Sequence, residues 1–166
     1  MGEIAAPVLL SASHDTGEFC SGNNTLDDWL QKRALKNQDT GASKTFVISE
    51  VGSSRVIGYY ALATGSVERN TAKGSFARAM PHPIPVIILC RLAIDAQHQG
   101  KRLGAGLLKD AMLRTLAVAH NVGVRGILVH AISESAKRFY LKYGFKESAI
   151  EPMTLLISTK TLEAHL

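Results

Sequence analysis

Three stretches of the chain repeat apolar residues near the 3.6-residue spacing of an α-helix. The first predicts a helix over residues 25–37, which Thr25 opens as the first residue of a capping box. The second predicts a helix over residues 103–122, and the third predicts one that begins at Ser133 or Ser135. An apolar helix face of this kind packs against a neighbouring layer of the fold.

Shorter runs of apolar, β-branched and aromatic residues predict the strands. They cover residues 8–10, 44–50, 55–64, 86–94, 126–131, 145–147 and 154–158. Gly52-Ser53-Ser54 indicates a hairpin turn between the second and third strands. The fourth is almost wholly apolar, as in a strand buried on both faces, and follows a long basic loop over residues 68–85. The order of helices and strands predicts a mixed α/β sandwich.

Composition narrows the class of protein without changing this fold. The chain has 166 residues, of which 46% are hydrophobic and 20% charged, so we expect one globular domain over residues 1–166. No apolar run reaches the roughly 18 residues of a membrane span, and the first residues lack the features of a secretory signal. With only two cysteines, we expect a reduced, cytoplasmic protein with no metal site and no membrane partner.

The net charge of +5 is unevenly distributed along the chain. Residues 55–102 hold seven basic and two acidic side chains, an excess equal to that of the whole chain. Such a cationic stretch could serve an anionic cofactor, a nucleic acid or simply a solvated surface.

The first chemical motif is Gln99-Gly100-Lys101-Arg102-Leu103-Gly104-Ala105-Gly106, which follows the buried strand and opens a long helix. A loop that enters a helix leaves N–H groups unpaired at the positive end of the helix dipole. Glycines let a phosphate approach that backbone closely, so the motif suits a pyrophosphate. The spacing matches neither a Walker loop nor a dinucleotide fingerprint.

A second motif begins where the strand over residues 126–131 ends. It reads Ala131-Ile132-Ser133-Glu134-Ser135-Ala136-Lys137-Arg138-Phe139-Tyr140-Leu141-Lys142-Tyr143-Gly144-Phe145. Together the two motifs resemble the GNAT superfamily of acetyl-CoA-dependent N-acetyltransferases. The first is a polar turn and Gln-x-x-x-x-Gly-x-Gly that leads into a helix, and the second is Ala-x-x-Phe-Tyr-x-x-x-Gly-Phe. The resemblance covers about residues 44–150. It implies an α/β fold whose mixed, mostly antiparallel sheet is flanked by helices, with a splayed strand pair that forms the acetyl-CoA site.

The resemblance also implies which residues hold acetyl-CoA. The backbone of Leu92, Ala93 and Ile94 would receive the acetyl arm. Those implied around the pyrophosphate are Gln99, Gly100, Lys101, Arg102, Leu103, Gly104 and Ala105, and the second motif adds Ser133, Ala136 and Phe139. Arg102 departs from the family pattern because it replaces the first motif glycine. Its amide stays available to a phosphate if its φ is not positive, and its side chain either adds a charge-assisted contact or faces solvent.

A narrower resemblance reaches both ends of the chain. Three segments of the chain resemble segments of one GNAT branch, the toxins of type II toxin–antitoxin modules. They are Phe19-Cys20-Ser21-Gly22, Leu26-Asp27-Asp28-Trp29-Leu30 and the strand over residues 87–94. Those toxins acetylate the α-amino group of aminoacyl-tRNA and so block translation. The resemblance therefore implies an aminoacyl-tRNA substrate, a ribbon–helix–helix antitoxin as partner and a homodimer.

Tyr140 is the candidate general acid. A phenol is protonated at neutral pH and can donate its proton to a thiolate of similar basicity. No histidine pairs with a carboxylate at a telling spacing. The amine of an aminoacyl ester is largely neutral at pH 7, so a dedicated base is not required.

Several basic residues are candidates for contacts with tRNA phosphates, which give affinity without sequence reading. They are Lys32, Arg33 and Lys36 on the first helix, and Arg69, Lys73 and Arg78 on the long loop. Two other readings stay open. One is a GNAT enzyme that acts on a small amine or a protein N-terminus, and the other is a non-catalytic acyl-CoA-binding module.

Overall fold

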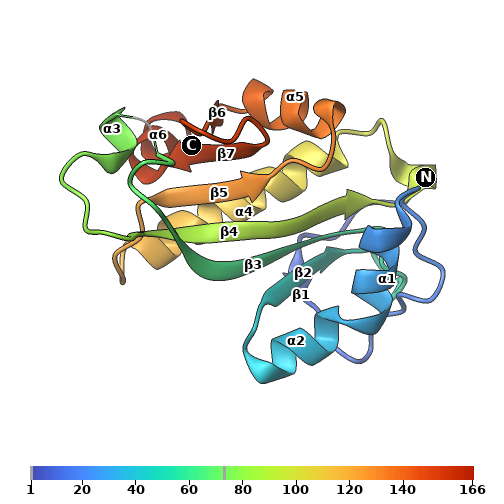
Figure 1. The fold of residues 1–166 in the computed structure, drawn as a ribbon. Helices are drawn as coiled ribbons and strands as arrows, with labels where there is room; N and C mark the ends of the chain where they lie inside the picture. The colour runs from blue at the N-terminus through green and yellow to red at the C-terminus, as the bar shows by residue number, and fades with distance from the viewer. Residues whose placement is uncertain (1, 73) are drawn as a thin grey trace. The chain divides into compact units, whose positions relative to one another are not determined.

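The computed structural model describes residues 2–72 and 74–166 (Figure 1). The strands are β1 Val8–Leu9, β2 Lys44–Ile48, β3 Gly58–Val67, β4 Ile84–Ile94, β5 Gly126–His130, β6 Lys146–Glu147 and β7 Thr154–Ser158. The α-helices are α1 Asn24–Lys32, α2 Ala34–Thr40, α3 Gly74–Ala77, α4 Leu103–Ala119, α5 Glu134–Lys142 and α6 Thr159–His165. A 3₁₀ helix, η1 Ala96–His98, lies between β4 and α4.

The strands form a seven-stranded sheet in the order β1-β2-β3-β4-β5-β7-β6. The pairs β1–β2, β2–β3, β5–β7 and β6–β7 are antiparallel. The pair β4–β5 is parallel, with Ile87–Leu89 opposite Ile127–Val129. The prediction of a mixed, mostly antiparallel sheet with helices is therefore confirmed.

Residues 1–63 and 90–111 form one compact unit, unit 1. Tyr59 on β3 lies in its core, where its ring centre is 5.5 Å from that of Phe19 in an edge-to-face contact and 5.9 Å from that of Trp29 in a stacked one. The Tyr59 hydroxyl donates a hydrogen bond of 2.7 Å to the carbonyl of Leu26. These contacts hold α1 against β3. The apolar helix face predicted from the sequence is therefore the face that packs on the sheet.

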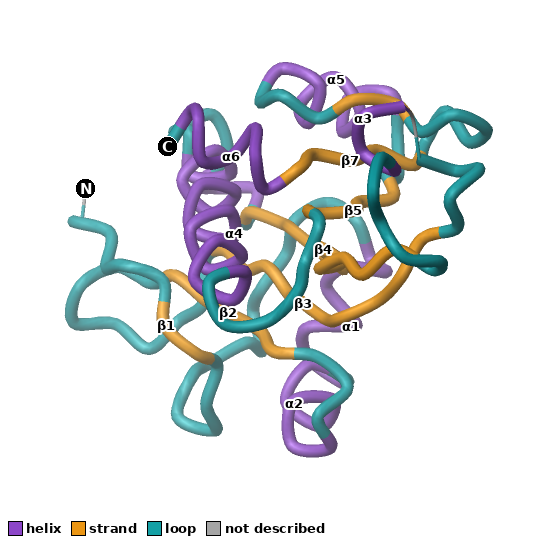
Figure 2. The backbone as a smooth tube through the Cα atoms, turned by 90° about the vertical axis from the view of Figure 1, so that its left-hand side faces the viewer, coloured by secondary structure: helices purple, strands orange, loops and turns teal. Residues whose placement is uncertain are grey.

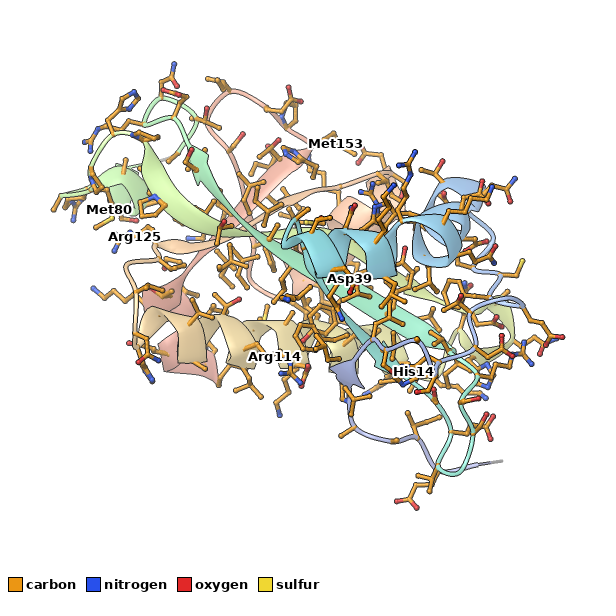
Figure 3. All side chains as sticks on the ribbon, turned by 90° about the horizontal axis from the view of Figure 1, so that it is seen from below. His14, Asp39, Met80, Arg114, Arg125 and Met153 are labelled. Carbon is orange, nitrogen blue, oxygen red and sulfur yellow. The ribbon has the colours of Figure 1, made fainter. Side chains whose placement is uncertain are left out.

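Residues 64–89 and 112–166 form a second compact unit, unit 2. Its core joins Phe76 of α3 to apolar residues of β4, β5 and β7. Gly126 opens β5 because a Cβ there would lie 2.0 Å from the carbonyl oxygen of Ile157 and 2.9 Å from the Phe76 ring. Met80 and Arg125 lie at the same end of this unit (Figure 3). Glycine thus lets α3 pack directly on the start of β5.

The helix predicted over residues 25–37 is wrong in its boundaries. The chain leaves the helical conformation at Arg33, whose φ is −123°, and α1 and α2 are separate helices. The buried Gln38 holds α2 in place, because its side-chain nitrogen donates to the carbonyl of Leu10 at 2.7 Å and its side-chain oxygen accepts from the Thr45 amide at 3.0 Å. The cap is Asn23 rather than Thr25, since the Asn23 side chain accepts from the Leu26 amide.

Two helices were not expected from the sequence. α3 lies within the predicted loop over residues 68–85, and α6 follows directly on β7 (Figure 2). The side chain of Ser158 caps α6 by accepting from the Thr161 amide, and Leu162 is buried. Among the described residues, no helix combines the length and apolar character needed to cross a membrane.

Candidate active site

The loop between β4 and α4 is built around the buried Asp95. Its carboxylate accepts hydrogen bonds of 3.1 Å from the amides of Cys20 and Gln97, and the Arg55 guanidinium lies 3.8 Å away. The Asp95 amide donates to the carbonyl of Ile57 on the approach to β3. A carboxylate with this many donors fixes the start of the loop, a role that sequence reasoning missed.

Gln99, one of the predicted pyrophosphate residues, uses its side chain inside unit 1. The Gln99 amide nitrogen donates to the carbonyls of Ser21 at 2.8 Å and Ile94 at 2.9 Å. The Ala96 amide also donates to the Cys20 carbonyl. The loop is therefore fastened to the N-terminal segment around Ser21, and only the backbone of Gln99 remains for a phosphate.

Two residues in the centre of the loop have a positive φ. Gly100 has a φ of +81° and Arg102 a φ of +62°, whereas Lys101 between them is not in the left-handed region. The condition that φ of Arg102 is not positive is therefore not met. Turns that contain left-handed residues also form anion-binding concavities of backbone N–H groups, so the positive φ of Arg102 does not by itself exclude a phosphate.

The first turn of α4 continues this donor set. The N–H groups of Leu103, Gly104 and Ala105 have no partner one turn earlier within the helix, and no acidic residue lies in the turn. The Lys101 and Arg102 side chains are exposed. On the other side of the loop lies the end of β4, where Leu92 and Ile94 are half-buried and Ala93 belongs to the core. These residues fit the anionic and extended parts of a coenzyme A thioester.

In unit 2, α5 carries Tyr140. The predicted cap is confirmed at Ser133, whose hydroxyl accepts from the Ala136 amide at 3.1 Å. The Tyr140 ring packs edge-on against Phe139 at 5.2 Å and Phe145 at 5.4 Å. No hydrogen bond joins its hydroxyl to another described residue. Burial raises the pKa of the Tyr140 hydroxyl well above its usual value. The group is thus a protonated donor with no partner of its own.

The basic candidates for RNA contact fall into two groups that belong to different units. In unit 1, Lys32 of α1, Arg33 between the two helices and Lys36 of α2 are exposed, and Lys32 lies 3.8 Å from Asp28. In unit 2, the Arg69 guanidinium donates to the Met80 carbonyl and so holds the loop closed on itself. Arg78 is exposed, and Lys73 lies outside the described residues.

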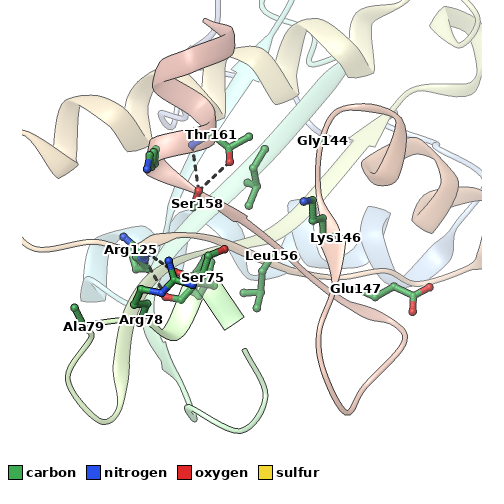
Figure 4. A pocket seen from close by; sticks show the side chains of 13 residues that line it. Ser75, Arg78, Ala79, Arg125, Gly144, Lys146, Glu147, Leu156, Ser158 and Thr161 are labelled. Carbon is green, nitrogen blue, oxygen red and sulfur yellow. Dashed lines mark hydrogen bonds between the residues drawn. The ribbon is translucent and has the colours of Figure 1, made fainter. Parts of the chain in front are cut away.

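Sequence reasoning also missed three cations of unit 2, namely Arg125, Lys146 and Lys160. With Arg78 they line a pocket of about 400 Å³ (Figure 4). These residues come from separate segments of the chain, and no spacing in the sequence brings them together. Their only signal in the sequence was the general excess of positive charge.

The chain is similar to known acetyltransferases over almost its whole length. Residues 42–147 match the model of the acetyltransferase (GNAT) domain family. A tRNA-acetylating toxin of Mycobacterium tuberculosis is 44% identical over 164 residues, covering 99% of this chain and 98% of that protein. A probable toxin TacT of Sinorhizobium fredii is 24% identical over 160 residues, covering 91% and 88%.

Solved structures agree with the sequence matches. A crystal structure of a tyrosine-to-phenylalanine mutant of KacT superposes with a TM-score of 0.92 at 25% identity, covering 99% of each chain. AtaT in complex with acetyl-methionyl-tRNA superposes with a TM-score of 0.90 at 27% identity, covering 98% of each chain. Similarity of this extent includes the ends of the chain that lie beyond the acetyltransferase domain match.

Proposed function

This chain belongs to the GNAT acetyltransferase family, and we propose that it is the toxin of a type II toxin–antitoxin system. It transfers the acetyl group of acetyl-CoA to the α-amino group of an aminoacyl-tRNA and so blocks translation. The observation that carries this proposal is the 44% identity to a tRNA-acetylating toxin over 99% of the chain. The full coverage of both proteins supports one acetyltransferase domain over residues 1–166.

The chemistry is the attack of a neutral amine on a thioester. The bond between carbonyl carbon and sulfur breaks, the amide bond forms, and the thiolate of coenzyme A leaves with the electron pair. Tyr140 gives its proton to that thiolate. Burial keeps the Tyr140 hydroxyl protonated at neutral pH, and no hydrogen bond to another described residue competes for that proton. The amine needs no dedicated base and loses its own proton to solvent, and solvent returns a proton to the Tyr140 phenolate.

The loop after β4 holds the acetyl donor. The amides around Gly100 and Arg102 and the first turn of α4 bind the pyrophosphate through oriented N–H groups. The end of β4 at Leu92, Ala93 and Ile94 presents extended backbone to the acetyl arm. Ser133, Ala136 and Phe139 are the proposed cofactor contacts from α5. Ser133 also caps that helix, so its role there is to hold the helix start in place.

The macromolecular partners follow from the relatives. AtaT was solved with acetyl-methionyl-tRNA and with the C-terminus of the antitoxin AtaR. We extend this to an aminoacyl-tRNA substrate, a ribbon–helix–helix antitoxin and a homodimer for this chain. From the proposed tRNA substrate we infer a cytoplasmic protein. The proposed contacts with tRNA phosphates are Lys32, Arg33, Lys36, Arg69, Lys73 and Arg78.

A direct transfer assay tests the function. The protein is incubated with acetyl-CoA labelled in the acetyl group and with charged total tRNA, and the RNA is then digested by nuclease. We expect the label on the α-amino group of one or a few amino acids, and none with uncharged tRNA. Label that appears only when polyamines, aminoglycosides or peptides replace the tRNA would overturn the proposal in favour of a small amine or a protein N-terminus.

A further inference from the structure

Unit 2 contains a pocket whose lining includes neither Tyr140 nor any residue proposed to hold acetyl-CoA. It lies between α3, the residue before β5, the turn after α5, β7 and the start of α6 (Figure 4). Its volume of about 400 Å³ falls within the range of small-molecule sites. All its lining residues belong to unit 2. The pocket is therefore a feature of this unit alone.

The charge of the pocket is strongly positive. Arg78, Arg125, Lys146 and Lys160 line it, against a single carboxylate, Glu147. The Glu147 carboxylate is bound by the Lys137 ammonium at 2.7 Å, so it does not neutralise the four cations. Unit 2 as a whole holds ten basic and five acidic side chains, whereas unit 1 holds nine of each. The entire net charge of the chain thus belongs to the unit that contains the pocket.

The cations differ in how they are held. Arg125 is fixed, because its guanidinium donates to the carbonyls of Phe76 at 2.9 Å and Ser75 at 2.5 Å. Arg78, Lys146 and Lys160 have no ion-pair partner within residues 2–72 and 74–166. Figure 4 shows Arg78 and Arg125 together on one side of Leu156 and Lys146 on the other. Cations on opposite sides of a pocket favour an anion larger than one inorganic phosphate.

The same pocket offers apolar surface. Phe76, Leu156 and Ile157 contribute to its lining, and Ser75, Ser158 and Thr161 supply hydroxyl groups. An apolar wall beside several cations suits a ligand with a planar or sugar-like body and a charged end. A ligand that offered only a carboxylate would pair with the cations but leave the apolar wall without a contact.

We propose that the pocket binds a phosphorylated nucleotide, with its phosphates on Arg78, Lys146 and Lys160 and its nucleoside against Phe76 and Leu156. Two sources supply this chemistry, namely a single-stranded end of the substrate RNA and a free nucleoside triphosphate. The RNA source rests on the proposed function, and the free nucleotide does not. Arg125 fixes the wall on which the ligand lies.

The test measures binding of two probes to the full chain, without acetyl-CoA. One probe is an uncharged, fluorescently labelled single-stranded RNA oligonucleotide, and the other is ATP. The variant combines Lys146→Gln with Lys160→Gln, because both side chains are exposed and neither fastens the fold. The matched control combines Lys44→Gln with Lys109→Gln, two exposed lysines of unit 1 that remove the same charge.

For RNA, each lost phosphate contact lowers the slope of log K against log salt concentration by about 0.7, so the double variant should lower it by about 1.4. The control should leave the slope nearly unchanged. If the variant loses affinity for RNA, and ATP does not displace RNA from the parent protein, the pocket binds RNA. If the variant loses affinity for ATP, the pocket binds a free nucleotide. If the variant binds both probes like the control, the proposal is wrong. Because the probes carry no amino acid and no acetyl donor is present, this outcome is independent of the transfer assay.

Discussion

At the scale of the residue, the buried tyrosines differ in whether their hydroxyl has a hydrogen-bond partner, and this difference indicates which of them is structural and which takes part in chemistry. The Tyr59 hydroxyl donates to the Leu26 carbonyl and the Tyr60 hydroxyl to the Asp110 carboxylate at 2.5 Å. Both therefore satisfy a buried polar group inside unit 1. The Tyr140 hydroxyl has no such partner among the described residues, and its oxygen is not one of the fully buried polar atoms. A hydroxyl without a structural hydrogen bond is available to donate its proton in the transfer.

Tyr140→Phe should remove that proton while keeping the ring. We expect the rate of acetyl transfer to fall by about 10²–10⁴-fold, as for loss of a general acid. Affinity for acetyl-CoA and the free energy of unfolding should stay close to the parent values, because the packing on Phe139 and Phe145 is unchanged. Single-turnover kinetics and thermal melting check both parts. Tyr143→Phe, at the exposed residue that follows α5, is the matched control.

The raised pKa of Tyr140 adds a pH signature to this variant. Because burial raises its pKa above that of an unfolded tyrosine, about 10, the group stabilises the fold below pH 10 and this contribution is lost as the pH rises further. The parent activity should therefore show no alkaline limb from Tyr140 up to about pH 9.5. An activity that declines through pH 7–8 in the parent but not in Tyr140→Phe would contradict the assignment.

At the scale of the element, the loop before α4 shows what a motif can and cannot predict. The sequence identified the glycine-rich entry into a helix, since that pattern has a direct physical reading. It could not predict that Arg102 takes the left-handed conformation, because that depends on anchors far away in the chain. Asp95 and Gln99 supply these anchors by binding the backbone at Cys20 and Ser21.

Substitution at Arg102 tests whether the backbone or the side chain of the loop matters. A non-glycine residue in the left-handed region costs about 1–2 kcal/mol, and the extra freedom of glycine in the unfolded chain offsets about 0.5–1 kcal/mol of that. Arg102→Gly should therefore leave stability unchanged or raise it by roughly 0.5 kcal/mol. Arg102→Val should lower it by more than about 1 kcal/mol, because β-branched residues rarely adopt this conformation.

Acetyl-CoA affinity of the same two variants then decides the role of the loop. If oriented amides bind the pyrophosphate, Arg102→Gly keeps most of the affinity and Arg102→Val loses it. Isothermal titration calorimetry measures both dissociation constants. Equal losses in the two variants would instead show that the guanidinium carries the binding, and that the left-handed backbone is incidental.

At the scale of the whole molecule, sequence and structure divide the charge differently. Along the sequence, residues 55–102 alone account for the net charge of +5. In the structure, that segment is shared between the two units, and the complete excess belongs to unit 2. The fold class and both motifs were readable because they rest on local periodicity and spacing. The pocket cations were not, since the fold brings them together from separate segments, and the bend at Arg33 left no mark on the apolar spacing.

The neutral balance of unit 1 gives the proposed tRNA contacts on α1 and α2 a clear test. Lys32, Arg33 and Lys36 are three exposed cations in a unit with no net charge, so their effect on RNA is not hidden by a surrounding excess. The ion pair of Lys32 with Asp28 is solvent-exposed and contributes little to stability. Changing these side chains should therefore alter RNA binding without unfolding α1.

Lys32→Glu combined with Lys36→Glu should raise the KM for aminoacyl-tRNA by roughly tenfold at low salt and flatten its salt dependence, because phosphate contacts are lost. The KM for acetyl-CoA should not change, since the loop after β4 is untouched. Lys44→Glu with Lys109→Glu, equal in charge and also exposed, is the control. If both pairs raise the KM equally, the effect reflects net charge alone, and α1 and α2 do not contact the tRNA.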